Sequence, residues 1–183
     1  DKKILVSGAG MLGLIACAML KANGAAMVFV LDRSVQRLNF ARNFGIDGQI
    51  LMHANGDGND WIPDPAIGFD LTYDFTGVTN IMEYNIKALE IGGVAVFVGA
   101  THPQPPVKID AELIVRHLLC IRGLHNYNVQ DLVTAVDFME GHHDRFPFDQ
   151  MICGGYKLNE VNEAFEFALR NNPFRVGIDL QKI

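Results

Sequence analysis

Apolar stretches of strand length alternate with amphipathic stretches of helix length over the first two thirds of the chain. The stretches expected to form strands lie at residues 3–8, 27–31, 49–52, 69–75, 94–98 and 119–124. The stretches expected to form helices lie at residues 11–23, 34–44, 79–90 and 110–117. Strands that alternate with helices are typical of a parallel sheet with helices on both faces. The pattern therefore predicts an α/β fold with a doubly wound parallel sheet of six strands.

The breaks between these stretches are rich in glycine, proline and small polar residues. Residues 53–68 carry Pro63 and Pro65 and are expected to form a loop with at most one helical turn. Gly92–Gly93 is expected to turn the chain between the third helix and the fifth strand. A further polar break is expected at residues 141–144.

A glycine-rich turn joins the first predicted strand to the first predicted helix. Gly8, Gly10 and Gly13 have the spacing Gly-x-Gly-x-x-Gly, which after a strand and before a helix is typical of a dinucleotide-binding turn. In such a turn the first glycine permits the tight bend, the second admits the pyrophosphate, and the third packs the helix on the sheet. The helix that begins near Met11 and Leu12 directs free N–H groups and its positive end towards the phosphates.

Asp32 ends the second predicted strand, about 20 residues after the glycines, at the place of the ribose-binding acid of such sites. Its carboxylate can accept both adenosine ribose hydroxyls of NAD(H), and its charge opposes the 2′-phosphate of NADP(H). The sequence therefore predicts NAD(H) as the cofactor. Arg33 would partly offset this charge, and a helix-capping or solvated aspartate is the alternative interpretation.

Composition excludes several other classes of protein. The 183 residues carry a formal net charge of −6 and no basic block, which argues against a nucleic-acid partner. No apolar run approaches the roughly 18 residues of a membrane span, and no secretory signal opens the sequence. Cys17, Cys120 and Cys153 lie far apart among apolar neighbours, so we expect buried thiols in a reducing compartment and a cytoplasmic location.

The residues after the sixth predicted strand differ in character from those before it. Helices are expected at 130–140 and 159–170, with a short strand near Met151 and a last strand at 174–180. These elements make a poor independent core, so we expect them to pack on another domain. We therefore divide the chain into a dinucleotide-binding domain, 1–124, and a C-terminal segment, 125–183.

The chain resembles the C-terminal half of a medium-chain dehydrogenase/reductase, the zinc-type alcohol dehydrogenase superfamily. The segments that carry the resemblance, in chain order, are Val6–Gly13, Asp32–Leu38, Asp70–Gly77, Gly92–Gly99, Ile121–Leu124, Leu158–Phe165 and Arg175–Gly177. Ile121–Tyr127 and Pro173–Gly177 most resemble the alcohol dehydrogenases associated with phosphonate catabolism. Sorbitol- and threonine-dehydrogenase-like members are close alternatives.

The resemblance implies further cofactor contacts. Arg37 corresponds to a basic residue that reaches the ribose and adenine, and Arg175 to an arginine that reaches the pyrophosphate. The turns that line the cofactor from adenine to nicotinamide, and the strand end that meets the nicotinamide carboxamide, correspond to Thr76, Gly77, Val98, Gly99, Leu124, His125 and Asn126. A solvated arginine remains an alternative for Arg37 and for Arg175, and a wall of the substrate pocket is an alternative for His125.

The resemblance also implies the function. We expect an NAD(H)-dependent alcohol dehydrogenase acting on a small alcohol or carbonyl compound, with zinc polarising the oxygen. In the family the zinc ligands lie in an N-terminal catalytic domain, so we expect no catalytic or metal-ligating residue in this chain, and no activity from it alone. A non-catalytic NAD(H)-binding or assembly module and a zinc-free quinone or enoyl reductase are the alternatives.

The sixth predicted strand bears on assembly. Residues 119–124 come last in the strand order and are apolar apart from Arg122, so we expect an unprotected sheet edge. In the family resembled, this edge pairs with its own copy. The sequence therefore predicts a homodimer, or a tetramer built from such dimers, without nucleic-acid or membrane partners.

Overall fold

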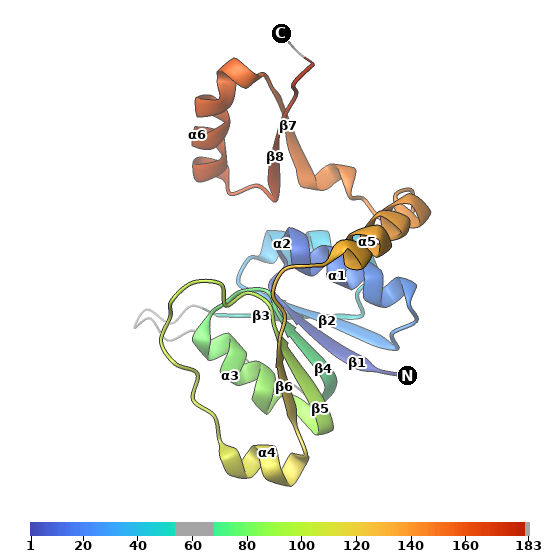
Figure 1. Cartoon of the computed structure of the whole chain (residues 1–183), viewed down its shortest axis with the longest axis vertical. Coiled ribbons are helices and arrows are strands. Elements are labelled where there is room, and N and C mark those ends of the chain that lie inside the picture. Colours follow the sequence, from blue (N-terminus) through green and yellow to red (C-terminus); the bar gives the residue numbers. More distant parts are fainter. Residues whose placement is uncertain (54–67, 182–183) are drawn as a thin grey trace. The chain divides into compact units, whose positions relative to one another are not determined.

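Six parallel strands form the main sheet of the computed structural model, which describes residues 1–53 and 68–181. Their order across the sheet is β3-β2-β1-β4-β5-β6 (Figure 1). The strands are β1 (Lys3–Ser7), β2 (Met27–Asp32), β3 (Gly48–Leu51), β4 (Phe69–Asp74), β5 (Leu89–Phe97) and β6 (Cys120–Gly123). This order confirms the predicted doubly wound fold. The direction of strand addition reverses between β1 and β4, and sheets of this kind bind ligands at the carboxyl ends beside that reversal.

Four helices cover the two faces of the sheet. α1 (Met11–Ala22) and α2 (Val35–Ala41) lie on one face, and α3 (Thr79–Lys87) and α4 (Ala111–His117) lie on the other (Figure 1). The predicted N-cap Ser34 accepts a hydrogen bond from the Arg37 N–H, at 3.2 Å, and so starts α2. Among the helices of the described residues, none has the length and apolarity needed to cross a membrane.

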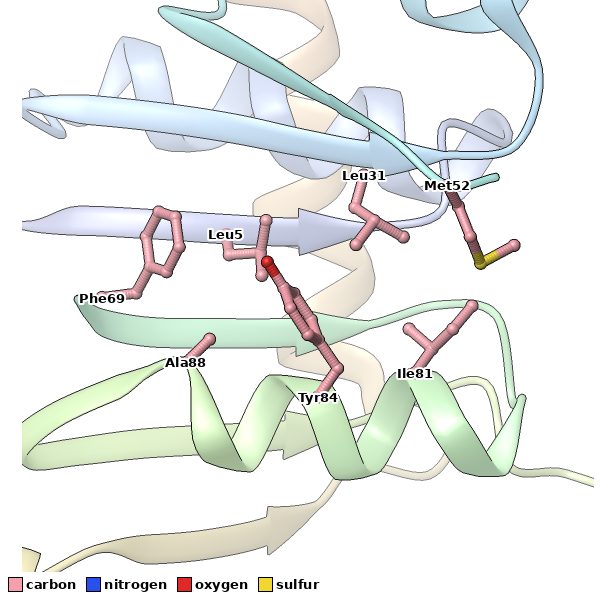
Figure 2. Close-up of a cluster of buried hydrophobic side chains, with 7 residues drawn as sticks. All are labelled: Leu5, Leu31, Met52, Phe69, Ile81, Tyr84 and Ala88. Carbon is pink, nitrogen blue, oxygen red and sulfur yellow. The ribbon is translucent and has the colours of Figure 1, made fainter. Parts of the chain in front are cut away.

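Apolar side chains of α3 pack on the sheet and form one part of the core. Figure 2 shows Ile81 and Tyr84 of this helix, and Ala88 directly after it, on the side that faces the buried side chains of the sheet, among them Leu5 of β1 and Phe69 of β4. These positions are three and four residues apart on the helix, so they share one face. The contact fixes α3 beneath β1 and β4, the two strands that end at the reversal of strand order.

The start of β5 differs from the prediction. The strand begins at Leu89, five residues before the predicted start at Val94, and Gly92–Gly93 lies inside it where a turn was expected. Leu89 pairs with Phe69 of β4 and is 5 % exposed, so its burial extends the strand. A shift in register between Phe69 and Leu71 accommodates the extra residues as a bulge, with Gly92 at a φ of 78°. The loop expected at 53–68 falls, apart from its two end residues, outside the described residues.

The structure divides into two compact units, Asp1–Val136 and Asp137–Ile183. The elements beyond β6 are α5 (Val129–His142), β7 (Ile152–Tyr156), α6 (Val161–Asn171) and β8 (Arg175–Ile178). In the second unit β7 and β8 pair in parallel. The polar break expected from Gly141 is wrong at its start, because α5 continues to His142, whose ring stacks on Phe138. The functional boundary placed after Leu124 remains a prediction.

The three cysteines differ in burial. Cys17 is fully buried in α1, and burial raises the pKa of its thiol to about 12. Cys120 and Cys153 are each partly exposed, because they lie on β6 and β7, which are an edge strand and a member of a two-stranded sheet. All three are free thiols. Full burial was expected for all three and is confirmed only for Cys17.

Candidate functional site

The turn after β1 has the backbone conformation that its glycines predict. Gly8 has a φ of 103°, a value that residues with a side chain rarely adopt, and its N–H donates to the Leu31 carbonyl at 2.8 Å. A Cβ on Gly13 would overlap the Gly8 carbonyl oxygen, so α1 can approach the turn only because residue 13 is glycine. A Cβ on Gly10 would have only the Arg37 guanidinium near it, at 3.7 Å. There is therefore room for another group beside Gly10, whereas there is none beside Gly13.

Asp32 joins the turn after β1 to the turn after β2. One carboxylate oxygen accepts the Ala9 N–H at 2.7 Å, and the other accepts the Ser34 N–H at 2.8 Å. Each carboxylate oxygen can accept two hydrogen bonds, so the half-buried group retains capacity for further donors. Ser34, and not Asp32, caps the N-terminus of α2. Asp32 instead links the turns after β1 and β2 through its hydrogen bonds.

The two arginines near Asp32 differ in position. The Arg37 guanidinium lies beside Gly10, and its side chain is half-buried. Arg33 is exposed to solvent. The structure thus brings Arg37, and not Arg33, to the glycine turn.

The turns after β4 and β5 pack against each other at the same edge of the sheet. Gly77 has a φ of 69°, and a Cβ on it would overlap the Gly99 carbonyl oxygen. A Cβ on Gly99 would in turn overlap the Gly77 amide nitrogen. The Thr76 methyl carbon lies 3.1 Å from the position that a Cβ on Gly8 would occupy, so the turns after β1 and β4 are also in contact. Val98, beside Gly99, is half-buried.

Most of the remaining predicted residues lie at exposed positions. The Leu124 N–H donates to the Phe97 carbonyl at 3.0 Å, which places the end of β6 beside the end of β5. His125 and Asn126 follow, both exposed, with 3.2 Å between the histidine Nε2 and the asparagine Nδ2. Arg175 begins β8 in the second compact unit and is exposed. In the first turn of α1, Leu12 is 57 % exposed and Met11 is half-buried.

Sequence reasoning gave no role to Asp74, which organises the turn after β4. Its side chain is fully buried and accepts three hydrogen bonds from Thr76 and Gly77. The signal was present in the sequence, because an aspartate two residues before a threonine and three before a glycine is typical of a side-chain-stabilised turn.

The described residues do not offer a zinc site. Within residues 1–53 and 68–181, no three His, Cys, Asp or Glu side chains gather closely enough to hold a metal ion. His143 lies 3.2 Å from Asp144 through its Nε2, a pair that lacks the third and fourth ligands that zinc requires. The residues fit a dinucleotide instead, because the space beside Gly10 adjoins the N-terminus of α1 and a guanidinium.

Two curated relatives illustrate the similarity in sequence. Bovine sorbitol dehydrogenase is 34 % identical over 195 aligned positions, which cover 96 % of this chain and 49 % of the relative. The D-altritol 5-dehydrogenase of Agrobacterium fabrum is 31 % identical over 136 positions, 74 % of this chain and 38 % of the relative. The chain thus spans half or less of the length of these relatives. The particular resemblance to phosphonate-associated enzymes remains a prediction.

Solved structures show the same fold. An alcohol dehydrogenase from Thermotoga maritima matches with a TM-score of 0.83 at 22 % identity, over 98 % of this chain and 50 % of that one. An E. coli alcohol dehydrogenase complexed with NADH matches with a TM-score of 0.79 at 19 % identity, over 97 % and 51 %. A zinc-binding dehydrogenase from Sinorhizobium meliloti bound to NADP matches with a TM-score of 0.73 at 19 % identity, over 90 % and 48 %.

The family model described as zinc-binding dehydrogenase matches residues 12–141, well over half of the chain. That range runs from the first turn of α1 to the last turn of α5 and contains five of the six strands of the main sheet. The match shows that the chain belongs to the zinc-binding dehydrogenase family.

Proposed function

We propose that this chain binds NAD(H) along the carboxyl edge of its main sheet and forms the cofactor-binding part of an alcohol dehydrogenase. When bound, NAD(H) would supply the hydride acceptor or donor that interconverts an alcohol and a carbonyl compound, with the hydroxyl proton exchanged with solvent. The substrate is a small alcohol or carbonyl compound, and zinc, held by residues outside the described ones, would polarise its oxygen. We expect no alcohol oxidation from the isolated chain, because no three His, Cys, Asp or Glu side chains of the described residues gather to hold a zinc ion.

The hydrogen bonds that Asp32 accepts are the observation that best supports this proposal. A carboxylate that bonds to Ala9 N–H at 2.7 Å stands directly beside the glycine turn, where an adenosine ribose would lie. Its free acceptor capacity receives the ribose hydroxyls, and its charge disfavours a 2′-phosphate. The NAD(H) preference is our proposal, since the similar solved structures contain NADH in one case and NADP in another.

The remaining residues act on other parts of the cofactor. The N-terminal N–H groups of α1 and the space beside Gly10 receive the pyrophosphate, and Arg37 contributes positive charge there. The turns at Thr76–Gly77 and Val98–Gly99 line the path to the nicotinamide. Leu124, His125 and Asn126 meet the carboxamide. The role of Arg175 at the pyrophosphate remains a prediction from the resemblance. Arg33, next to Asp32 in the sequence, partly offsets the carboxylate charge and weakens the discrimination against a 2′-phosphate.

The choice of cofactor tests the proposal through Asp32. We expect the unmodified chain to bind NADH more tightly than NADPH in fluorescence titrations. Asp32→Ala removes the ribose acceptor and releases Ala9, so NADH binding falls roughly ten- to hundredfold, as expected for hydrogen bonds to a charged group. NADPH binding falls less, because the repulsion is removed at the same time, and the ratio of the two affinities narrows.

The control variant is Glu90→Gln, which removes one negative charge at the amino ends of the strands, away from the proposed cofactor site. Glu90 pairs there with Lys3 at 2.8 Å. This variant should leave both affinities within twofold. Equal affinities for NADH and NADPH in the unmodified chain would contradict the role of Asp32, and no binding of either would contradict the proposed function.

A further inference from the structure

We propose that Asp74 is a positioning residue for the cofactor, because its buried carboxylate holds in place the turns that line the cofactor path. The inference rests on the proposed function, since it concerns the same edge of the sheet. Asp74 is the last residue of β4, the strand next to β1 at the reversal of strand order.

The first step concerns the contacts of the carboxylate itself. Oδ1 accepts the Thr76 N–H at 3.0 Å and the Thr76 hydroxyl at 2.6 Å, and Oδ2 accepts the Gly77 N–H at 3.0 Å. The side chain is fully buried. Three donors therefore converge on one group that has no exposure to water, and together they fix the direction in which the chain leaves β4.

The second step connects this turn to the turn after β5. The Asp74 carbonyl oxygen accepts the N–H groups of both Val98 and Gly99 at 2.9 Å. Gly77 and Gly99 approach so closely that a Cβ on either would overlap the backbone of the other. Because the two glycines share this contact, a displacement of Gly77 displaces Gly99 as well.

The third step connects the turn after β4 to the glycine turn and to α3. The Thr76 methyl group lies against Gly8, and the Thr76 hydroxyl also accepts the Val78 N–H at 3.1 Å, at the N-cap of α3. Asp74 orients Thr76 through both its N–H and its hydroxyl. One side chain thus determines the positions of three turns at the edge where NAD(H) would lie.

Only a carboxylate satisfies all three donors. An amide of the same shape would direct an N–H group at one of the three donors, so one hydrogen bond would be replaced by a repulsive contact. A buried charge is costly unless it is fully hydrogen-bonded, and here the hydrogen bonds are those that shape the turn. The hydrogen bonds that shape this turn therefore explain why a negative charge is buried at Asp74.

The test measures NADH affinity for Asp74→Asn at a temperature well below the melting temperature of each variant. We expect affinity to fall about tenfold, the size of a lost charge-assisted hydrogen bond. Asp70→Asn is the matched control, since Asp70 lies on the same strand at the opposite edge, where it pairs with Lys2 at 2.7 Å. It should change the melting temperature and leave NADH affinity unchanged.

Two variants of Thr76 extend the test and replace it if Asp74→Asn does not fold. Thr76→Ser keeps the hydroxyl bonded to Asp74, so it should bind NADH more tightly than Thr76→Val does. Thr76→Val keeps the shape, loses that bond and should bind several-fold more weakly. Equal NADH affinities of the two variants would overturn the inference.

Two other results would also overturn it. If Asp74 were important only for folding, Asp74→Asn would lower the melting temperature at unchanged affinity. If the carboxylate acted only as a charge near an anionic cofactor, the neutral variant would bind NADH more tightly. Failure of the unmodified chain to bind NADH would contradict the proposed function and this inference together. Equal NADH affinities of the unmodified chain and Asp74→Asn would contradict the inference alone.

Discussion

At the residue scale, Gly10 and Gly13 differ in what an added methyl group would meet. Gly10→Ala places a methyl group in the space beside Arg37, at a φ of −80° that alanine adopts readily. We expect weaker NADH binding with a stability change within about 1 kcal/mol. Gly13→Val forces α1 away from the Gly8 carbonyl and should cost about 1–3 kcal/mol or more. NADH titration and thermal melting of each variant measure the two effects separately.

The outcomes distinguish the roles of the two glycines. Unchanged NADH affinity in Gly10→Ala would show that this turn is structural only. An unchanged melting temperature in Gly13→Val would contradict the close approach of helix and turn.

Residues whose role depends on local spacing could be predicted from the sequence, and those that depend on tertiary contacts could not. The conformation of Gly8 and the place of Asp32 follow from the order of strand, turn and helix, which the sequence shows directly. The turn that Asp74 stabilises also has a local signal, but its link to Val98 and Gly99 depends on the pairing of β4 with β5. The order of residues along the chain contains no signal for the contact between Asp74 and these two residues.

At the scale of elements, the prediction succeeded where apolar periodicity and caps agree, and it failed where a tertiary contact overrides turn chemistry. α1, α2 and α4 lie where their patterns and capping residues place them. Gly92–Gly93 is a good local turn, but the burial of Leu89 against Phe69 extends β5 through it. α5 extends past its predicted end at residue 140 to His142, whose ring stacks on Phe138.

The packing of α3 on β1 and β4 gives a prediction at this scale. Phe69 is fully buried and forms an edge-to-face pair with Phe29, with ring centroids 5.6 Å apart. Phe69→Ala should lower the free energy of unfolding by about 3–5 kcal/mol in urea titrations, and Phe69→Leu should lower it less. Lys87→Ala, at an exposed position of α3, should change it by no more than about 0.5 kcal/mol. A small effect of Phe69→Ala would show that this part of the core is loosely packed.

At the scale of the whole molecule, strand order could be predicted because alternating strands and helices with a dinucleotide turn permit few topologies. The order places β3 and β6 at the two edges of the sheet, which confirms the predicted edge position of the sixth strand. The division into compact units at Val136 could not be predicted, because α5 contributes residues to both units and its amphipathic pattern is continuous.

The free edge of β6 leads to the prediction about assembly. We propose that this edge pairs with its own copy across a two-fold axis, so that each strand offers and receives the same hydrogen bonds. Leu124 donates its N–H to Phe97 of β5, and donors point to alternate sides along a strand, so the N–H of Ile121 faces the free edge. Light scattering at micromolar concentration should give twice the chain mass of 20.2 kDa.

The variant Ile121→Pro removes the outward donor and should shift the protein to monomer, because proline cannot donate to a neighbouring strand. Ile121→Ala is the matched control: it shortens the side chain but keeps the N–H, and it should remain a dimer. Melting curves of both variants establish that the monomer is folded. An unmodified chain that is monomeric under these conditions would contradict the proposal, and so would a dimer that persists in Ile121→Pro, since the pairing would then use another surface.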